Sequence, residues 1–335
     1  MVCSNGKSQF SAFKSLSRQL ICTLVLLPLT AQPALAESAK LDLTAMAVRT
    51  DADQHLVSNS GMADGVFYQT FGSGKPVLII NGGPGLDRAG FETIAKAIAA
   101  KSYQTILFDQ RGTGRSPLPE INGSTIQMGL MVDDIETLRR HLKHPKLTIL
   151  GHSFGGMLGG AYAAKYPQHI EKLIFSSSGG LDLAFRDQFS KRFNANLTLA
   201  EQTKMQAYQV RQAAGDDSVD IRDALALIRA HAYVIDKNKA PAIAARLKVV
   251  NMQINSLVYE DLERIKFDLK SSFQDFKAPV IVLQGENDVI SVDTAKSIAN
   301  SFKQARLVIM PNCAHYGWLD SPTLYYASIF EFLQS

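Results

Sequence analysis

The sequence predicts an α/β fold, in which helices cover both faces of a mostly parallel, doubly wound sheet. Short apolar runs alternate with stretches of helical periodicity along most of the chain. These runs are continuous rather than alternating, so each strand is expected to be buried on both faces. A glycine-rich segment at 151–156 follows one such run and precedes a helical stretch, as at a sharp strand-to-helix turn.

The strands and helices of this sheet are expected from two kinds of spacing. Apolar runs predict strands at 77–80, 105–108, 147–150, 172–175, 279–283 and 306–310. Apolar residues three or four positions apart predict helices around 91–98, 131–142, 298–302 and 325–333. Strand and helix therefore follow one another, as they do in doubly wound folds.

The alternation stops between residues 181 and 276. This segment has few strand-type runs and has helical character at 200–214, 221–233 and 240–257. Because it follows the fourth strand, it is expected to lie over the carboxyl edge of the sheet, where ligands bind in open α/β sheets. We therefore predict a core in two parts, 37–180 and 277–335, and a helical cap at 181–276 that shapes the substrate pocket.

The first 36 residues are predicted to be a signal peptide. Lys7, Lys14 and Arg18 precede the apolar run 20–29, and Ala34-Leu35-Ala36 provides a small-x-small cleavage site. The alternative is a membrane anchor, but the apolar run has only about half of the ~20 residues that a span needs. We expect an exported protein, periplasmic or secreted, with no stable membrane insertion after cleavage.

The composition of the remaining chain limits its partners. Loss of the leader leaves 299 residues and reduces the formal net charge from +4 to +1. A nearly neutral chain gives no reason to expect nucleic acid as a partner. Cys313 becomes the only cysteine, and no CxxC, HExxH or paired-histidine spacing occurs. We therefore expect no internal disulfide, no metal and no cofactor, and the sequence gives no indication of the oligomeric state.

The segment Gly151-His152-Ser153-Phe154-Gly155-Gly156 has the Gly-x-Ser-x-Gly pattern of a nucleophile elbow. In such a turn the serine oxygen is exposed above the sheet, and glycines allow the strand and helix to approach closely. The alternative is an ordinary turn serine. We interpret Ser153 as the nucleophile.

A nucleophilic serine needs a base, and the base needs an orienting carboxylate, in the chain order serine, acid, histidine. Asp288 follows the run 279–283, and His315 follows the run 306–310. Both residues are therefore expected at the same sheet edge as Ser153. The alternatives for the acid are Glu286 and Asp293, of which Asp293 is better placed to cap the next helix.

An acyl-transfer site also needs two N–H groups that face the oxyanion of the tetrahedral intermediate. We assign one to Phe154, which follows the nucleophile. We assign the other to Gly83 in the segment Asn81-Gly-Gly-Pro-Gly85, with Gly82 as the alternative. The alternative interpretation of this segment is a simple Gly-Pro turn without a catalytic role.

Taken together, these segments resemble the proline iminopeptidase (prolyl aminopeptidase) family of α/β-hydrolases over roughly residues 64–180 and 277–335. The resemblance is carried by 81–85, the Asp-Gln-Arg-Gly stretch within 108–116, the elbow 151–156, 285–288 and His315. It implies an α/β-hydrolase fold with Ser153 as nucleophile, His315 as base and Asp288 as orienting acid. It also implies that Asp109, Gln110 and Arg111 brace the loop under the site.

The same resemblance implies a serine aminopeptidase that removes an N-terminal residue from a short-peptide or small-molecule substrate. Two features depart from the family: position 81 is Asn rather than His, and the family's cap glutamates cannot be matched to acids in 181–276. A carboxylesterase, a lipase-like enzyme or a C–C bond hydrolase with the same triad is therefore the alternative. A third interpretation is a ligand-binding protein without catalysis. The presence of Ser153, Asp288 and His315 argues against it.

Overall fold

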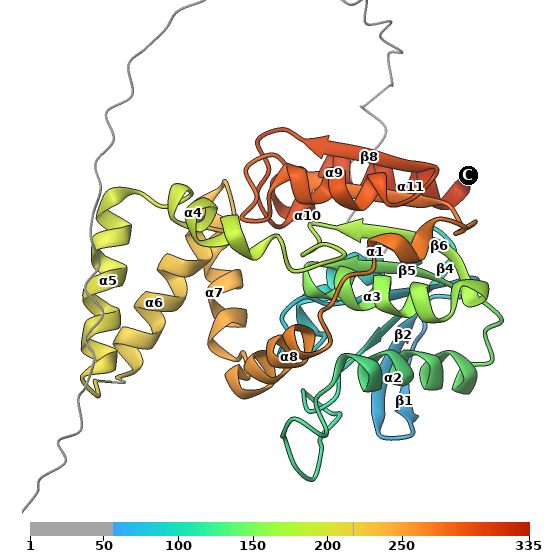
Figure 1. Cartoon of the computed structure of the whole chain (residues 1–335), viewed down its shortest axis with the longest axis horizontal. Helices are drawn as coiled ribbons and strands as arrows, with labels where there is room; N and C mark the ends of the chain where they lie inside the picture. Colours follow the sequence, from blue (N-terminus) through green and yellow to red (C-terminus); the bar gives the residue numbers. More distant parts are fainter. Residues whose placement is uncertain (1–55, 217) are drawn as a thin grey trace, which may run out of the picture. The chain divides into compact units, whose positions relative to one another are not determined.

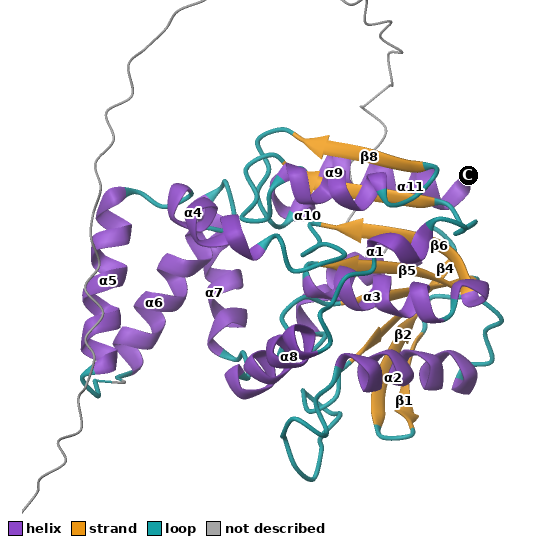
Figure 2. Cartoon of the chain, viewed as in Figure 1, coloured by secondary structure: helices purple, strands orange, loops and turns teal. Residues whose placement is uncertain are grey.

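The computed structural model describes residues 56–216 and 218–335 (Figures 1 and 2). The predicted signal peptide, residues 1–36, lies outside the described residues. Within the described part, no helix is long and apolar enough to cross a membrane.

The α/β prediction is confirmed by a single eight-stranded sheet with the strand order β1-β2-β4-β3-β5-β6-β7-β8. In this order, all pairs from β4 to β8 are parallel. The pairs β1–β2 and β2–β4 are antiparallel. The six predicted runs lie in the six parallel strands. These strands are β3 (Lys75–Ile80), β4 (Tyr103–Phe108), β5 (Leu147–His152), β6 (Ile170–Ser176), β7 (Val280–Gly285) and β8 (Ala305–Met310).

The antiparallel strands β1 (Ser58–Ala63) and β2 (Val66–Phe71) were not predicted from the sequence. They form a hairpin in which Ala63 pairs with Val66 across Asp64 and Gly65. Both turn residues have positive φ, 48° and 84°. An Asp-Gly pair is a strong signal for such a two-residue turn, so the sequence did contain a signal for this hairpin.

Helices bury both faces of the sheet, which explains the continuous apolar runs. In β3, Val77 and Ile79 pack in a cluster with α1 (Glu92–Ala99) and α11 (Pro322–Gln334). The alternating residues Leu78 and Ile80 pack on the opposite side, in a cluster that includes residues of three core helices. Those helices are α2 (Met128–His141), α3 (Phe154–Lys165) and α9 (Val292–Asn300). Successive side chains of a strand point to opposite faces, so a strand covered on both sides is apolar at every position.

Five α-helices lie between β6 and β7, beyond the arrowheads of the parallel strands in Figure 2. We call them the cap helices: α4 (Arg186–Ala195), α5 (Leu199–Ala213), α6 (Val219–His231), α7 (Ala240–Lys248) and α8 (Met252–Arg264). The segment leaves and rejoins the core at neighbouring points, because Leu269 N donates to Leu181 O at 2.8 Å.

The stretch 240–257, for which helical character was predicted, forms two helices, α7 and α8, with a break at 249–251. Asn251 caps α8, since its side-chain oxygen accepts a hydrogen bond from Ile254 N at 3.1 Å. Its backbone N–H donates instead to Gly85 O at 2.9 Å, in the loop after β3. The break therefore joins the cap to the core.

Candidate active site

Ser153 stands at the junction of β5 and α3 with φ 55° and ψ −121°. A non-glycine residue in this region is strained, and such strain persists only where neighbours hold it. Ser153 N donates to Ser176 O at 3.0 Å, and Ser153 O accepts from Gly179 N at 3.2 Å. The end of β6 and the loop after it therefore hold the turn in place.

Two glycines allow α3 to begin directly against the sheet. A Cβ atom on Gly155 would lie 2.1 Å from Ile80 O, and one on Gly151 would lie 2.3 Å from Gly155 O. Any side chain at either position would push the helix away from β3 and β5. This close approach is the geometric reason for the Gly-x-Ser-x-Gly pattern.

Asp288 and His315 meet in the loops that follow β7 and β8. His315 Nδ1 lies 2.8 Å from Asp288 Oδ1, and both side chains are buried. The carboxylate also accepts hydrogen bonds from Ile290 N at 3.0 Å and from Gln284 Nε2 at 2.8 Å. These donors hold the carboxylate in one orientation, so His315 donates through Nδ1 and keeps Nε2 free to accept a proton.

The other carboxylates considered for the acid lie elsewhere. Glu286 is exposed, and Asp293 lies in the first turn of α9, where it pairs with Lys296. Of the three carboxylates, Asp288 is the one in contact with His315.

Ser153 and His315 line the same cavity, which has a volume of about 790 Å³. Among the described residues, no hydrogen bond joins Ser153 Oγ to the imidazole. Such catalytic bonds are often long before a substrate binds and tighten in the reactive complex.

The segment with Gly82 and Gly83 packs directly against the elbow. A Cβ atom on Gly82 would lie 2.9 Å from Ser153 Cβ. Gly82, Gly83 and Phe154 all line the cavity beside Ser153. Phe154 is the first residue of α3, where backbone N–H groups have no acceptor within the helix. Both residues chosen to supply the oxyanion N–H groups therefore line the cavity that bears the nucleophile.

A second histidine, His152, lies beside the candidate base, with the ring centroids of His152 and His315 4.7 Å apart. Complete burial and the nearby His315 hold the pKa of His152 well below its usual range. His152 therefore stays neutral, and its ring packs against Tyr316 and Trp318.

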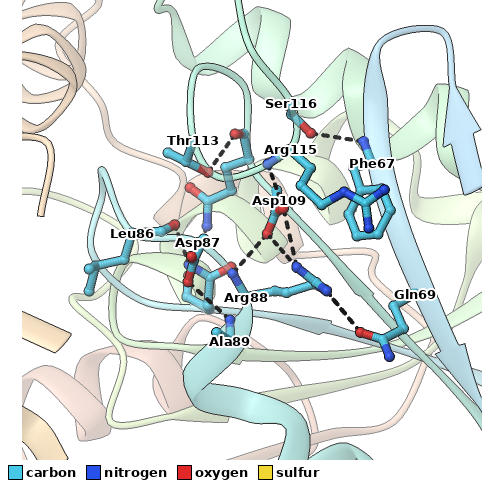
Figure 3. Close-up of polar contacts among 12 residues, drawn as sticks. Phe67, Gln69, Leu86, Asp87, Arg88, Ala89, Asp109, Thr113, Arg115 and Ser116 are labelled. Atoms are coloured by element: carbon cyan, nitrogen blue, oxygen red, sulfur yellow. Dashed lines mark hydrogen bonds and ion pairs between the residues drawn. The ribbon is translucent and has the colours of Figure 1, made fainter. Parts of the chain in front are cut away.

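A buried polar network centred on Asp109 supports the loop after β3 (Figure 3).

 Asp109 accepts hydrogen bonds from Arg88 N at 3.0 Å and from Arg115 N at 2.9 Å, and it forms an ion pair with the Arg88 guanidinium. Gln110 Nε2 donates to Asn81 O at 2.9 Å, while Asn81 Nδ2 donates to Leu86 O at 2.9 Å. These bonds brace the loop that carries Gly83, and the amide of Asn81 takes part in them.

Arg111 has a different neighbour from Asp109 and Gln110. Its guanidinium binds Asp134 on α2, with Nη2 2.6 Å from Oδ1, and donates to two backbone carbonyls. This pair ties the loop after β4 to α2 rather than to the cavity.

The cap helices and their connections contribute cavity-lining side chains that the sequence analysis did not identify individually. The aromatic contributors are Phe185, Phe189, Tyr233 and Tyr259. Burial raises the pKa of the Tyr259 phenol, so this hydroxyl stays protonated at neutral pH. Aromatic residues in amphipathic helices usually pack in a core, so no local signal marked these as cavity residues.

The charges on the cavity wall are basic. Arg186 and Arg246 line the cavity, whereas no aspartate or glutamate does so within the described ranges. Arg246 is paired with Asp87, with Nη1 2.5 Å from Oδ1, and Arg186 forms an ion pair with Glu263. Each arginine of the cavity wall is therefore neutralised by a carboxylate, Asp87 for Arg246 and Glu263 for Arg186.

Comparisons with known proteins agree with this architecture. A family model for the alpha/beta hydrolase fold matches residues 75–322. The proline iminopeptidase of Heyndrickxia coagulans is 25% identical over 281 residues, which cover 81% of this chain and 95% of that protein.

Solved structures show the same fold. The proline iminopeptidase of Mycobacterium smegmatis has a TM-score of 0.63 at 18% identity, covering 83% of this chain and 98% of that one. An esterase from Exiguobacterium antarcticum has a TM-score of 0.61 at 17% identity, covering 81% and 96%. With its family match over most of the sequence and its largely parallel sheet, this chain belongs to the α/β-hydrolase fold family.

Proposed function

We propose that the chain is a serine hydrolase that cleaves acyl bonds through an acyl-enzyme on Ser153. The observation that carries the proposal is the buried 2.8 Å hydrogen bond between His315 and Asp288, on the same cavity as the strained Ser153. This arrangement matches the roles of a serine, histidine and aspartate triad.

In the proposed reaction, His315 Nε2 accepts the proton of Ser153 Oγ as that oxygen attacks the substrate carbonyl carbon. The N–H groups of Gly83 and Phe154 stabilise the resulting oxyanion. His315 then donates the proton to the leaving group, and the carbon–leaving group bond breaks. Water, deprotonated by the same imidazole, hydrolyses the acyl-enzyme and restores Ser153.

For the substrate, we propose short peptides with a free N-terminus, so that the enzyme acts as an aminopeptidase. The support is the set of shared motifs and the similarity to proline iminopeptidases over nearly their full length. The cavity wall restricts the form in which the substrate amine can bind, because it presents arginines and no carboxylate among the described residues. Burial of an unpaired ammonium is costly, so we expect the substrate amine to bind in its neutral form.

A second candidate is the hydrolysis of uncharged carboxylic esters. It is favoured by the same cavity wall, which has aromatic side chains and, among the residues that the structure describes, no carboxylate to neutralise a cation. An ester with an apolar acyl group meets no desolvation penalty for a charge.

Paired substrates separate these candidates. We expect an aminoacyl-naphthylamide with a free amine to be cleaved. The ratio of its kcat/KM to that of a nitrophenyl ester should rise by up to about tenfold per pH unit until the pH reaches about 8. The reason is that the α-amine has a pKa of about 7.7–8.0 and only its neutral fraction binds. The ester provides the matched control, because it reports the pH dependence of the catalytic groups alone.

The outcomes are distinct. Turnover of the ester and of an N-acetylated amide, without turnover of the free amine, would establish the second candidate instead. An amide rate that falls with rising pH relative to the ester would show that the cavity binds the ammonium form. Failure of every acyl substrate, together with no labelling by a fluorophosphonate, would contradict the serine hydrolase proposal itself.

We further propose that the enzyme is exported, on the basis of the basic start, the apolar run and the Ala34-Leu35-Ala36 site. The expected result is a mature protein that begins at Glu37 and is recovered outside the cytoplasm. Intact-mass measurement of the protein from fractionated cells checks this, and a full-length mass in the cytoplasmic fraction would contradict it.

A further inference from the structure

One cap helix, α4, contacts the loop that carries the candidate acid. Arg192 Nε donates to Asp288 O at 2.7 Å, and Arg192 Nη2 donates to Glu286 O at 3.0 Å. One turn later, Asn196 Nδ2 donates to Asn287 O at 2.7 Å. Three successive carbonyl groups of the acid loop, residues 286–288, are thus held by two side chains of one helix.

The acid loop is tied in turn to the loop that carries the base. Glu286 N donates to Met310 O at 3.0 Å, and Asn287 N donates to Cys313 O at 2.9 Å. The cap also reaches the base directly, because His315 N donates to Tyr233 O at 3.1 Å. Both loops of the candidate triad therefore hydrogen-bond to the cap as well as to each other.

The same helix contributes to the wall of the cavity. Arg186, Phe189 and Ser190 of α4 line it, whereas Arg192 and Asn196 do not. One part of α4 therefore faces the cavity while another part holds the acid loop.

We propose that Arg192 is a positioning residue for catalysis, which keeps the Asp288 loop in register with His315, and that Asn196 assists it. This inference rests on the proposed function, because it assigns Asp288 and His315 to the reaction. Hydrogen bonds from a guanidinium are stronger than neutral ones, and the planar group can reach two carbonyls at once. Small displacements of a catalytic group are sufficient to lower the rate strongly.

The test compares substitutions on α4, assayed with a nitrophenyl ester. We expect Arg192→Gln to lower kcat by about 10- to 100-fold, with KM changed by less than about threefold, because Arg192 does not line the cavity. Arg192→Lys should recover part of the loss, since an ammonium can still reach one of the carbonyls. Lys191→Gln is the matched control, because this exposed neighbour on the same helix is expected to leave both constants unchanged.

A second readout separates positioning from a general loss of structure. The downfield NMR signal of the His315 Nδ1 proton reports its hydrogen bond to Asp288, and we expect Arg192→Gln to shift or broaden it while the thermal unfolding transition is retained. If Arg192→Gln fails to fold, Arg192→Lys and Asn196→Ala carry the same test, with a loss of kcat expected for each.

The proposal is overturned if folded Arg192 and Asn196 variants keep the wild-type kcat and the wild-type proton signal. It is also overturned if these variants change KM alone. Failure of the triad itself is distinguishable, because Asp288→Asn would then leave kcat unaffected whatever the Arg192 variants do.

Discussion

Replacement of Ser153 by alanine is expected to lower kcat by about 10⁴- to 10⁶-fold. The alanine has no oxygen to attack the substrate, so no acyl-enzyme forms. The cavity wall changes by only one hydroxyl group, and KM is therefore expected to change little. Steady-state kinetics with an ester or an amide substrate measures both constants.

Covalent labelling provides the control for this result. A fluorophosphonate should label the wild-type protein on Ser153, as mapped by mass spectrometry of peptides, and should not label Ser153→Ala. Activity that persists in purified Ser153→Ala, or a label on another serine, would mean that Ser153 is not the nucleophile.

Asp288→Asn is expected to lower kcat by about 10⁴-fold. Asp288 accepts hydrogen bonds from Gln284 Nε2, Ile290 N and His315 Nδ1. An asparagine has only one side-chain oxygen for these donors, and its amide group would face a donor. Where that amide meets His315 Nδ1, the imidazole proton must move to Nε2, and the histidine can no longer accept the serine proton.

The matched control is Asp293→Asn, which changes an exposed carboxylate in the first turn of α9 and is expected to leave kcat within about twofold of wild type. Glu286→Gln tests the remaining alternative for the acid. A large loss for Glu286→Gln with near-normal activity for Asp288→Asn would assign the acid to Glu286.

The parallel strands could be predicted because burial on both faces requires apolar residues at successive positions. Val77 to Ile80 are buried on both faces of the sheet, so all four are apolar, and the buried residues 106–108, 149–150, 173–175 and 280–283 repeat this in β4 to β7. The hairpin of β1 and β2 was missed although Asp64-Gly65 marks its turn, because neither the edge strand β1 nor its neighbour β2 has a continuous apolar run.

The cap was harder to predict because its details depend on contacts with the core. The break between α7 and α8 occurs where Asn251 caps one helix and donates its N–H to Gly85 O, 166 residues earlier in the chain. The sequence predicted helical character on both sides of this point, and nothing local marked the break. The aromatic cavity residues were likewise indistinguishable from ordinary core residues.

The sequence by itself determined the fold class and the types of reactive residue at the ends of the strands, because periodicity and turn chemistry act over a few neighbouring positions. Only the tertiary structure decided which carboxylate meets His315, which side chains line the cavity and how α4 holds the acid loop. Those contacts join residues as distant as Arg192 and Asp288, 96 positions apart. They depend on how helices and loops pack together, and no local pattern encodes that packing.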